Sequence, residues 1–190
     1  MVDYEEDIKQ CVQILAEGGT ILYPTDTVWG IGCDATNASA VDKVFTLKKR
    51  PKEKSMIVLL ADARDILHCV AAPPHDIVDI LEGFDRPTTV IYDGALGLAG
   101  NVINEDGSIA IRVTADPFCK ALIKRFRRPI VSTSANISGS PAASMYLHIS
   151  PQIIATVDYV VKYRQEDEGN NAPSRLVRLN NKGDIEVLRP

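Results

Sequence analysis

The chain has 190 residues, a formal net charge of −4 and an apolar fraction of 45%, which is the composition of an ordinary globular protein. This length supports one domain with a buried core, so residues 1–190 are expected to form a single domain. No apolar run is long enough to span a bilayer, and residues 1–7 are acidic, unlike a signal peptide, so we expect a cytoplasmic protein that does not bind membranes.

The first half of the chain alternates between helical and extended patterns. In chain order these patterns predict a helix over residues 5–17, a strand over 20–23, a strand running into a polar loop over 24–34, a helix over 37–47, a strand over 56–60, and helices over 62–70 and 75–81. The helix over 37–47 is expected to begin at an Asn37 or Ser39 cap and to end before Pro51, because the residue before a proline avoids the helical region.

The second half of the chain ends in an antiparallel pattern. In chain order it predicts a strand over residues 88–92, a long loop over 93–107, a strand over 108–113, a helix over 116–127, a strand over 129–132, a polar loop over 133–139, a helix over 150–157, a strand over 158–163, an acidic loop over 164–172, and a hairpin of 174–179 with 185–188. We therefore expect an α/β fold with an open, twisted mixed sheet and flanking helices, in which one of the two long loops closes over a site.

A basic segment stands out in this acidic chain. Residues 48–54 contain five cations and one anion, directly after the helix predicted over 37–47. Cations at a helix C-terminus suit the helix dipole, so a solvated basic turn explains the charge, and charge alone slightly favours it over an anion site. A second cationic cluster follows at residues 124–128.

Four further polar residues leave alternatives open. Arg112 is the one charge in an apolar strand and needs either an internal carboxylate or a bound anion, and the sequence favours neither. Arg189 raises the same question more weakly. Ser134 and Asn136 follow a buried strand in a pattern that can bind a polyanion, although taken alone it favours a hydrogen-bonded turn.

Several common chemistries lack their sequence signature. The chain has no Walker A loop, no Gly-x-Gly-x-x-Gly after a strand and no Gly-x-Ser-x-Gly elbow. Reduced core thiols are expected at the widely spaced Cys11, Cys33, Cys69 and Cys119. No metal-ligand spacing connects His68, His75 and His148. We expect neither a protein metal site nor a covalent nucleophile.

Taken together, four segments resemble the YrdC-like family of threonylcarbamoyl-AMP synthases, in the short form that has only the catalytic domain. They are residues 24–34, 48–51, 109–113 and 134–139, which occur in the family's order and spacing. The resemblance implies an open α/β sheet with a positively charged concave face. It also implies that L-threonine, bicarbonate or CO2, and ATP react to give threonylcarbamoyl-adenylate and pyrophosphate. That product would feed the N6-threonylcarbamoyladenosine modification of tRNA through downstream threonylcarbamoyl-transferase proteins.

The resemblance also implies a role for each matched residue. The family's catalytic tetrad, which holds the triphosphate and carbamoyl ends, is matched by Lys48, Arg50, Ser134 and Asn136. The implied threonine contacts are Thr27, Arg112, Ser132 and Ser174. The implied ATP contacts are the tetrad together with Lys54 and Arg189. Mg2+ is expected to arrive with ATP, bridging phosphate oxygens with few protein ligands.

The chain departs from the family's pattern at positions that bear on substrate contacts. The departures are Trp29-Gly30-Ile31, Ser55-Met56, Leu59, Asp85-Arg86 and Arg175-Leu176. One alternative function is a non-catalytic module that binds tRNA or double-stranded RNA with the same basic face, which the pI of about 5.4 argues against. Another is use of a different carbamate donor, as in hydrogenase-maturation carbamoyltransferases, but the flanking segments of those proteins are absent.

Overall fold

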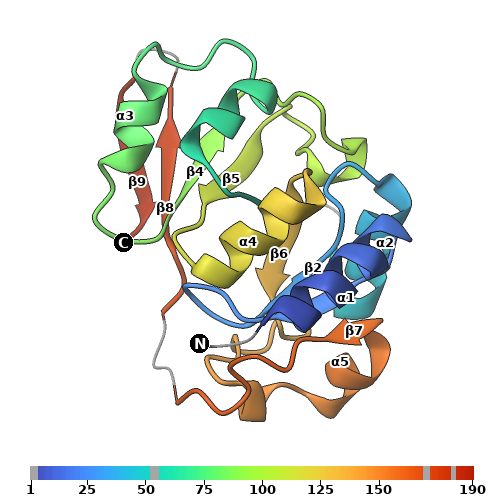
Figure 1. Ribbon diagram of the computed structural model, residues 1–190. Coiled ribbons are helices and arrows are strands. Elements are labelled where there is room, and N and C mark those ends of the chain that lie inside the picture. The colour runs from blue at the N-terminus through green and yellow to red at the C-terminus, as the bar shows by residue number, and fades with distance from the viewer. Residues whose placement is uncertain (1–3, 52–55, 169–171, 181–182) are drawn as a thin grey trace.

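A computed structural model describes residues 4–51, 56–168, 172–180 and 183–190 (Figure 1). Its α-helices are α1 (Glu5–Ala16), α2 (Ala38–Lys48), α3 (Ile77–Glu82), α4 (Pro117–Phe126) and α5 (Pro151–Thr156). Its strands are β1 (Ile21–Tyr23), β2 (Gly30–Gly32), β3 (Ile57–Leu60), β4 (Thr88–Tyr92), β5 (Ile109–Val113), β6 (Ile130–Ser134), β7 (Tyr159–Val160), β8 (Arg175–Leu179) and β9 (Ile185–Arg189). Short 3-10 helices cover Ala63–His68, Gly100–Val102 and Tyr146–His148.

The strands form one mixed sheet in the order β7-β1-β2-β6-β3-β5-β4-β8-β9. The neighbours β1 and β7, β3 and β5, and β4 and β8 are parallel, and the remaining pairs are antiparallel. The terminal hairpin of β8 and β9, red in Figure 1, lies at the opposite edge of the sheet from β7. The mixed α/β fold with flanking helices that the sequence predicts is therefore confirmed.

Two apolar cores lie on opposite faces of the sheet. Leu59 and Ile130 pack with helices α1 and α4, whereas Val58 and Val131 pack with α2 and α3. This separation follows from the alternation of side chains along β3 and β6. Arg112 pairs in register with Leu59, so it points to the face that α1 and α4 cover only in part. The uncovered part of this face is free to form a site.

Helix α2 packs on the other face of the sheet, and the turn after it brings Arg50 to the face that bears Arg112. Asn37 caps its N-terminus by accepting a hydrogen bond from the amide of Ala40 at 3.2 Å, which selects Asn37 over Ser39 as the cap. The helix ends at Lys48 because Lys49 adopts a left-handed conformation with φ of 49°. Its amide bonds to carbonyls of the last turn, so the helix stops two residues before Pro51.

The order predicted for residues 24–34 is wrong. A loop comes first, and strand β2 follows and pairs antiparallel with β1. A Cβ atom on Gly32 would lie 2.7 Å from the Tyr23 ring and 2.8 Å from the carbonyl oxygen of Val131. Glycine at this position therefore makes room for the Tyr23 ring over strand β2, and it does not mark a loop that follows a strand.

Other departures concern element type and length. The helix predicted over residues 62–70 is a 3-10 helix over Ala63–His68, β7 has only two residues, and β6 extends to Ser134, into the expected loop. The four cysteines are buried and unpaired, as expected of core thiols. In the part of the chain that the structure describes, no helix is long and apolar enough to cross a bilayer, and no group of His, Cys, Asp and Glu could hold a metal ion.

Candidate active site

A cavity of about 360 Å³ opens on the face of the sheet that bears Arg112. Its floor comes from β2, β3, β5 and β6, and its walls come from the loop before β2, the turn after α2, the loop after β6 and the two ends of the terminal hairpin. Among its described lining residues, three are arginines and none is a carboxylate. We call it the arginine cavity. Its charge suits an anionic ligand.

The arginine cavity gathers most of the residues assigned from the resemblance. The predicted residues that line it are Thr27, Arg50, Arg112, Ser132, Ser134, Asn136, Ser174 and Arg189. Lys48 does not line it, and Lys54 lies outside the described residues. Residues far apart in the sequence thus meet in one place, although their individual roles stay predictions.

Lys48 lies behind the cavity wall. It is 1% exposed, and its ammonium nitrogen donates to the carbonyl oxygens of Ser134 and Asn136, the latter at 2.6 Å. Burial, and to a lesser degree the charge of Arg50, lowers the pKa of Lys48 to about 7. Lys48 therefore supports the loop that carries the other tetrad members, and its direct contact with phosphate stays a prediction.

The loop after β6 is held in a fixed shape. The Ser134 hydroxyl donates to Asn136 Oδ1 at 2.5 Å, and Asn136 Nδ2 donates to the carbonyl oxygen of Ser140 at 2.6 Å. The amide of Ser138 donates to the carbonyl oxygen of Lys48 at 3.0 Å. Because both the side chain and the carbonyl of Lys48 bind this loop, the polar groups of Ser134 and Asn136 are positioned before any ligand arrives.

Arg50 supplies a cation to the same region. It follows the left-handed Lys49 and is half-buried in the wall of the arginine cavity. Burial lowers the pKa of the Arg50 guanidinium, which nevertheless stays charged at neutral pH, since arginine is protonated far above it. Lys49, by contrast, is exposed.

Arg112 joins Thr27 to an internal carboxylate. Its Nη1 donates to Thr27 Oγ1 at 3.0 Å, and its Nη2 lies 3.3 Å from Asp26 Oδ1. Of the two partners that the sequence left open, the structure supplies the carboxylate. The side chain is nevertheless only 4% exposed and lines the cavity, and its Nε has no partner among the described residues. A buried donor without a partner is costly, so a ligand anion remains a fitting second partner.

Asp26 is a residue beside the cavity that the sequence reasoning missed. Its second oxygen accepts hydrogen bonds from the Thr114 hydroxyl at 3.3 Å and the Ala115 amide at 3.2 Å. It therefore ties the loop bearing Thr27 to the end of β5. Its position between two threonines, together with the need of Arg112 for a partner, was the signal that could have identified it.

Arg164 also holds the loop that bears Thr27. Arg164 donates to Asp116 Oδ2 at 2.7 Å and to the carbonyl oxygen of Thr25 at 3.4 Å. Arg164 belongs to the loop over residues 164–172 that the sequence names as one candidate lid. In the structure this residue binds the wall of the site, next to a Thr25 hydroxyl that lies 3.0 Å from that of Thr27.

The terminal hairpin closes the far side of the arginine cavity. The hydroxyl of Ser174 lies 2.7 Å from that of Thr89 in β4. Arg189 donates from Nε and Nη2 to the carbonyl oxygen of Ser174, at 3.2 and 2.7 Å. The placement of β8 therefore decides where both predicted ligand-binding residues of the hairpin lie.

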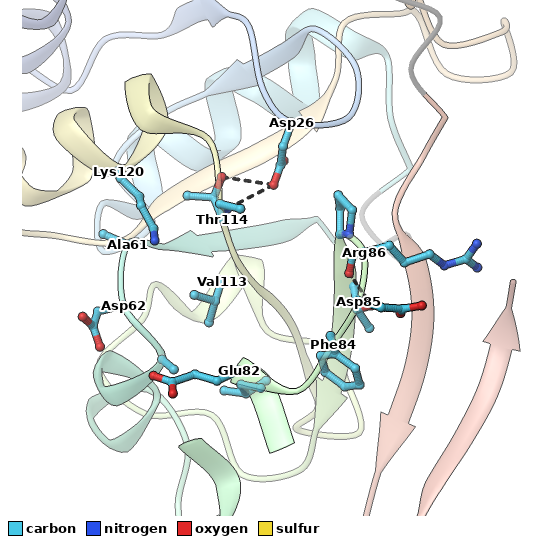
Figure 2. A pocket seen from close by; sticks show the side chains of 15 residues that line it. Asp26, Ala61, Asp62, Glu82, Phe84, Asp85, Arg86, Val113, Thr114 and Lys120 are labelled. Carbon is cyan, nitrogen blue, oxygen red and sulfur yellow. Dashed lines mark hydrogen bonds between the residues drawn. The ribbon is translucent and has the colours of Figure 1, made fainter. Parts of the chain in front are cut away.

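A second cavity of about 420 Å³ lies at the C-terminal ends of β3 and β5 (Figure 2). We call it the acidic cavity, since its lining carboxylates are Asp26, Asp62, Glu82 and Asp85. Its two cations are Arg86 and Lys120. Figure 2 shows Asp26 joined to Thr114 at one end of it, with Glu82 and Phe84 across the opening. Its excess of negative charge disfavours a polyphosphate ligand, although it is the larger cavity.

Comparison with known proteins identifies the family. The sequence model of the family that unites Sua5, YciO and YrdC, described as "Telomere recombination", matches residues 13–190. The chain belongs to this family. A threonylcarbamoyl-AMP synthase of Xanthomonas euvesicatoria pv. vesicatoria is 36% identical over 158 residues, which cover 82% of this chain and 84% of that protein. The family resemblance stated from the sequence is confirmed.

Solved structures of the family share the fold. Sua5 of P. abyssi, in a crystal structure with L-threonine, matches with a TM-score of 0.85 at 24% identity over 98% of this chain. This chain spans 54% of that protein. YciO of E. coli matches with a TM-score of 0.77 at 22% identity, covering 97% of this chain and 88% of YciO. At these identities the likeness establishes the fold alone.

Proposed function

We propose that this protein is a threonylcarbamoyl-AMP synthase, a nucleotidyltransferase that acts on L-threonine and ATP. The observation that carries the proposal is the arginine cavity, which brings Thr27 and Arg112 together with Arg50, Ser134 and Asn136 in a lining without carboxylates. The similarity to relatives of that name over four fifths of the chain supports the same activity. Bicarbonate or CO2 would supply the carbamoyl carbon.

At one end of the cavity, Arg112 would bind the carboxylate of threonine. Its Nη1 donates to Thr27 and its Nη2 faces Asp26, so the guanidinium plane is fixed, and each of these nitrogens carries a second N–H that could donate to the ligand. Arginine suits this task because its rigid fork matches a carboxylate. Ser132 and Ser174 would add hydroxyl contacts along the same wall.

At the other end, Arg50, Ser134, Asn136 and Arg189 would bind the triphosphate, with Lys54 as a further predicted contact. Addition of the threonine amine to CO2, with loss of a proton, would give N-carboxythreonine. Its carboxylate oxygen would then attack the α-phosphorus, so that a P–O bond forms as the bond to pyrophosphate breaks. The substrate supplies the nucleophile, so positioning and charge stabilisation suffice. Mg2+ would enter as part of MgATP, held by phosphate oxygens and water, because the described lining offers it no carboxylate.

The product would serve the N6-threonylcarbamoyladenosine modification of tRNA through downstream transferase proteins. Direct contact with tRNA, those downstream partners and a cytoplasmic location remain predictions. A purely RNA-binding role is not favoured, since it leaves the fixed polar loop after β6 and the buried Arg112 without a purpose.

The test is pyrophosphate release by the purified protein with MgATP and bicarbonate, measured with and without L-threonine. We expect release that requires threonine and saturates with it. A Thr27→Val variant, which keeps the side-chain volume but removes the hydroxyl that accepts from Arg112, should raise the KM for threonine. A matched control is Thr46→Val, whose hydroxyl binds only the exposed backbone of α2. Equal release with and without threonine would overturn the proposal.

A further inference from the structure

Three side-chain contacts bind Arg175, the first residue of β8, to the loop before β4 and to the first residue of β4. Its Cζ lies 5.1 Å from the centroid of the Phe84 ring, and its Nε donates to Thr88 Oγ1 at 3.2 Å. Its Nη2 lies 3.6 Å from Asp85 Oδ1. The contacts join segments 87 positions apart in the sequence. The chain neighbour of Arg175 is Ser174, which lines the arginine cavity.

The side chain of Arg175 cannot itself touch a ligand in that cavity. Along β8, Val177 and Leu179 enter the core beside α2 and α3, against which Phe84 also packs. Side chains alternate along a strand, so Arg175 points to that same face, away from the cavity. Any influence on the site must pass through the backbone.

The backbone path from Arg175 to the site is short. The amide of Arg175 donates to the carbonyl oxygen of Pro87 at 3.0 Å, and the preceding carbonyl, that of Ser174, accepts both hydrogen bonds from Arg189. The Ser174 hydroxyl meets Thr89 one residue along β4. A shift of the first residue of β8 would therefore move Ser174 and Arg189 together.

We infer that Arg175 is a positioning residue: it fixes the start of β8 against the loop at residues 84–88 and thereby places Ser174 and Arg189 at the arginine cavity. The inference rests on the proposed function, for which those two residues bind substrate. The hairpin lies at the sheet edge, with β9 exposed throughout, and β8 is otherwise held by its parallel pairing with β4 and by the buried side chains of Val177 and Leu179. In the described chain, β4 is the sheet neighbour on the inner side of β8.

The three contacts differ in weight. Asp85 is 81% exposed and its ion pair with Arg175 spans 3.6 Å, so solvent screens it strongly. The stack on Phe84 and the bond to Thr88 involve less exposed groups, and Thr88 is itself fixed by donating to the carbonyl oxygen of Arg86 at 2.9 Å. We therefore expect Asp85→Asn to act weakly and Arg175→Ala to act strongly.

The experiment compares Arg175→Ala with Arg178→Ala. Arg178 lies on the same strand and makes an ion pair of the same length, 3.6 Å, with Asp106, but it does not adjoin Ser174. Steady-state pyrophosphate release gives kcat and KM for threonine and ATP. We expect Arg175→Ala to raise at least one KM about tenfold with kcat changed less than threefold, since the lost positioning acts on binding. Arg178→Ala should change KM less than twofold, and Arg175→Lys, which loses the planar fork, should lie between them.

A second readout does not depend on activity. Hydrogen exchange of the Arg175 amide, whose bond to Pro87 would loosen, should accelerate in Arg175→Ala and not in Arg178→Ala. Unchanged KM values together with unchanged exchange would overturn the inference, as would equal effects of the two variants. The two proposals can also fail separately. If the wild type shows no threonine-dependent turnover but exchange is still faster in Arg175→Ala, the proposed function is overturned and the positioning role remains supported.

Discussion

Two cavities flank one ion pair in this protein, and their linings differ in charge. The arginine cavity is lined by Arg112, and the acidic cavity by its partner Asp26. The first has three arginines and no carboxylate among its described lining residues, whereas the second has four carboxylates and two cations. The acidic cavity is the larger of the two, but charge and the gathered polar side chains favour the arginine cavity.

The difference shows how one pair can separate two environments. Asp26 neutralises part of the charge of Arg112 from the side of the acidic cavity. It also accepts hydrogen bonds there from Thr114 and Ala115. The arginine is thereby fixed in place without a carboxylate entering the cavity that we propose accepts a triphosphate. If this division is correct, substitutions on the two sides should affect turnover very differently.

The largest effect is expected for Arg112→Gln. Loss of two charge-assisted bonds to a carboxylate, each of about 1.5 to 3 kcal/mol, should lower kcat/KM for threonine by about a hundredfold or more. The variant should also lose about 3 kcal/mol of folding stability, because Asp26 loses its cation. Pyrophosphate release and urea unfolding measure the two effects.

A second variant separates these effects. Adding Asp26→Asn to Arg112→Gln removes the uncompensated carboxylate and should restore part of the stability, but not the activity. Recovery of turnover in the double variant would mean that Arg112 acts only as the counter-ion of Asp26.

Arg50→Gln should lower turnover about ten- to hundredfold, the effect of one lost charge-assisted bond in the transition state. The matched control is Lys49→Gln, which removes the same charge one residue away from an exposed position. Its turnover should stay within about twofold of the wild type. Similar losses in both variants would indicate general attraction of ATP rather than a bound guanidinium.

Lys48→Met should cost about 2 kcal/mol of stability, because the carbonyl oxygens of Ser134 and Asn136 lose their buried donor. Lys48 has a pKa of about 7 when folded, against 10.5 as its ordinary value. Between these values the unfolded chain binds the extra proton, so Lys48 makes the wild type more stable as pH rises from about 7 towards 10.5. Below pH 7 both states are protonated and the contribution is flat.

Urea unfolding of the wild type and Lys48→Met at pH 6 and pH 9 tests this sign. The stability difference in favour of the wild type should be larger at pH 9. A difference that stays the same at both pH values would mean that the amine keeps its proton and that its hydrogen bonds outweigh its burial.

The smallest effect is expected in the acidic cavity. Glu82→Gln removes an exposed carboxylate from its lining without changing side-chain size. Both kcat and the KM for threonine should stay within about twofold of the wild type. A tenfold change would show that this cavity takes part in turnover.

Local patterns predicted the elements that depend on local chemistry. Strand β4 has the predicted bounds, and α2 begins at its Asn37 cap. The order of strand and loop in residues 24–34 was predicted wrongly. A glycine is needed at position 32 because the Tyr23 ring, from the neighbouring strand, leaves no room for a Cβ atom. Periodicity within a segment carries no information on such a contact.

The residues of the site also fall into those that the sequence could predict and those that it could not. The resemblance named the residues that line the arginine cavity, and charge pattern alone had left the basic turn and the loop after β6 open. The buried position of Lys48, the Asp26 partner of Arg112 and the Arg175 contacts with Phe84 depend on long-range packing. The position of Lys48 and the contacts of Arg175 could be found only once the sheet order was known, whereas the need of Arg112 for a partner already pointed to a carboxylate such as Asp26.

The most direct test of the central claim is a crystal structure with L-threonine and a non-hydrolysable ATP analogue. We expect the threonine carboxylate beside Arg112 and Thr27, and the phosphates beside Arg50 and the loop that bears Ser134. Threonine bound in the acidic cavity, with the arginine cavity unoccupied, would contradict the assignment.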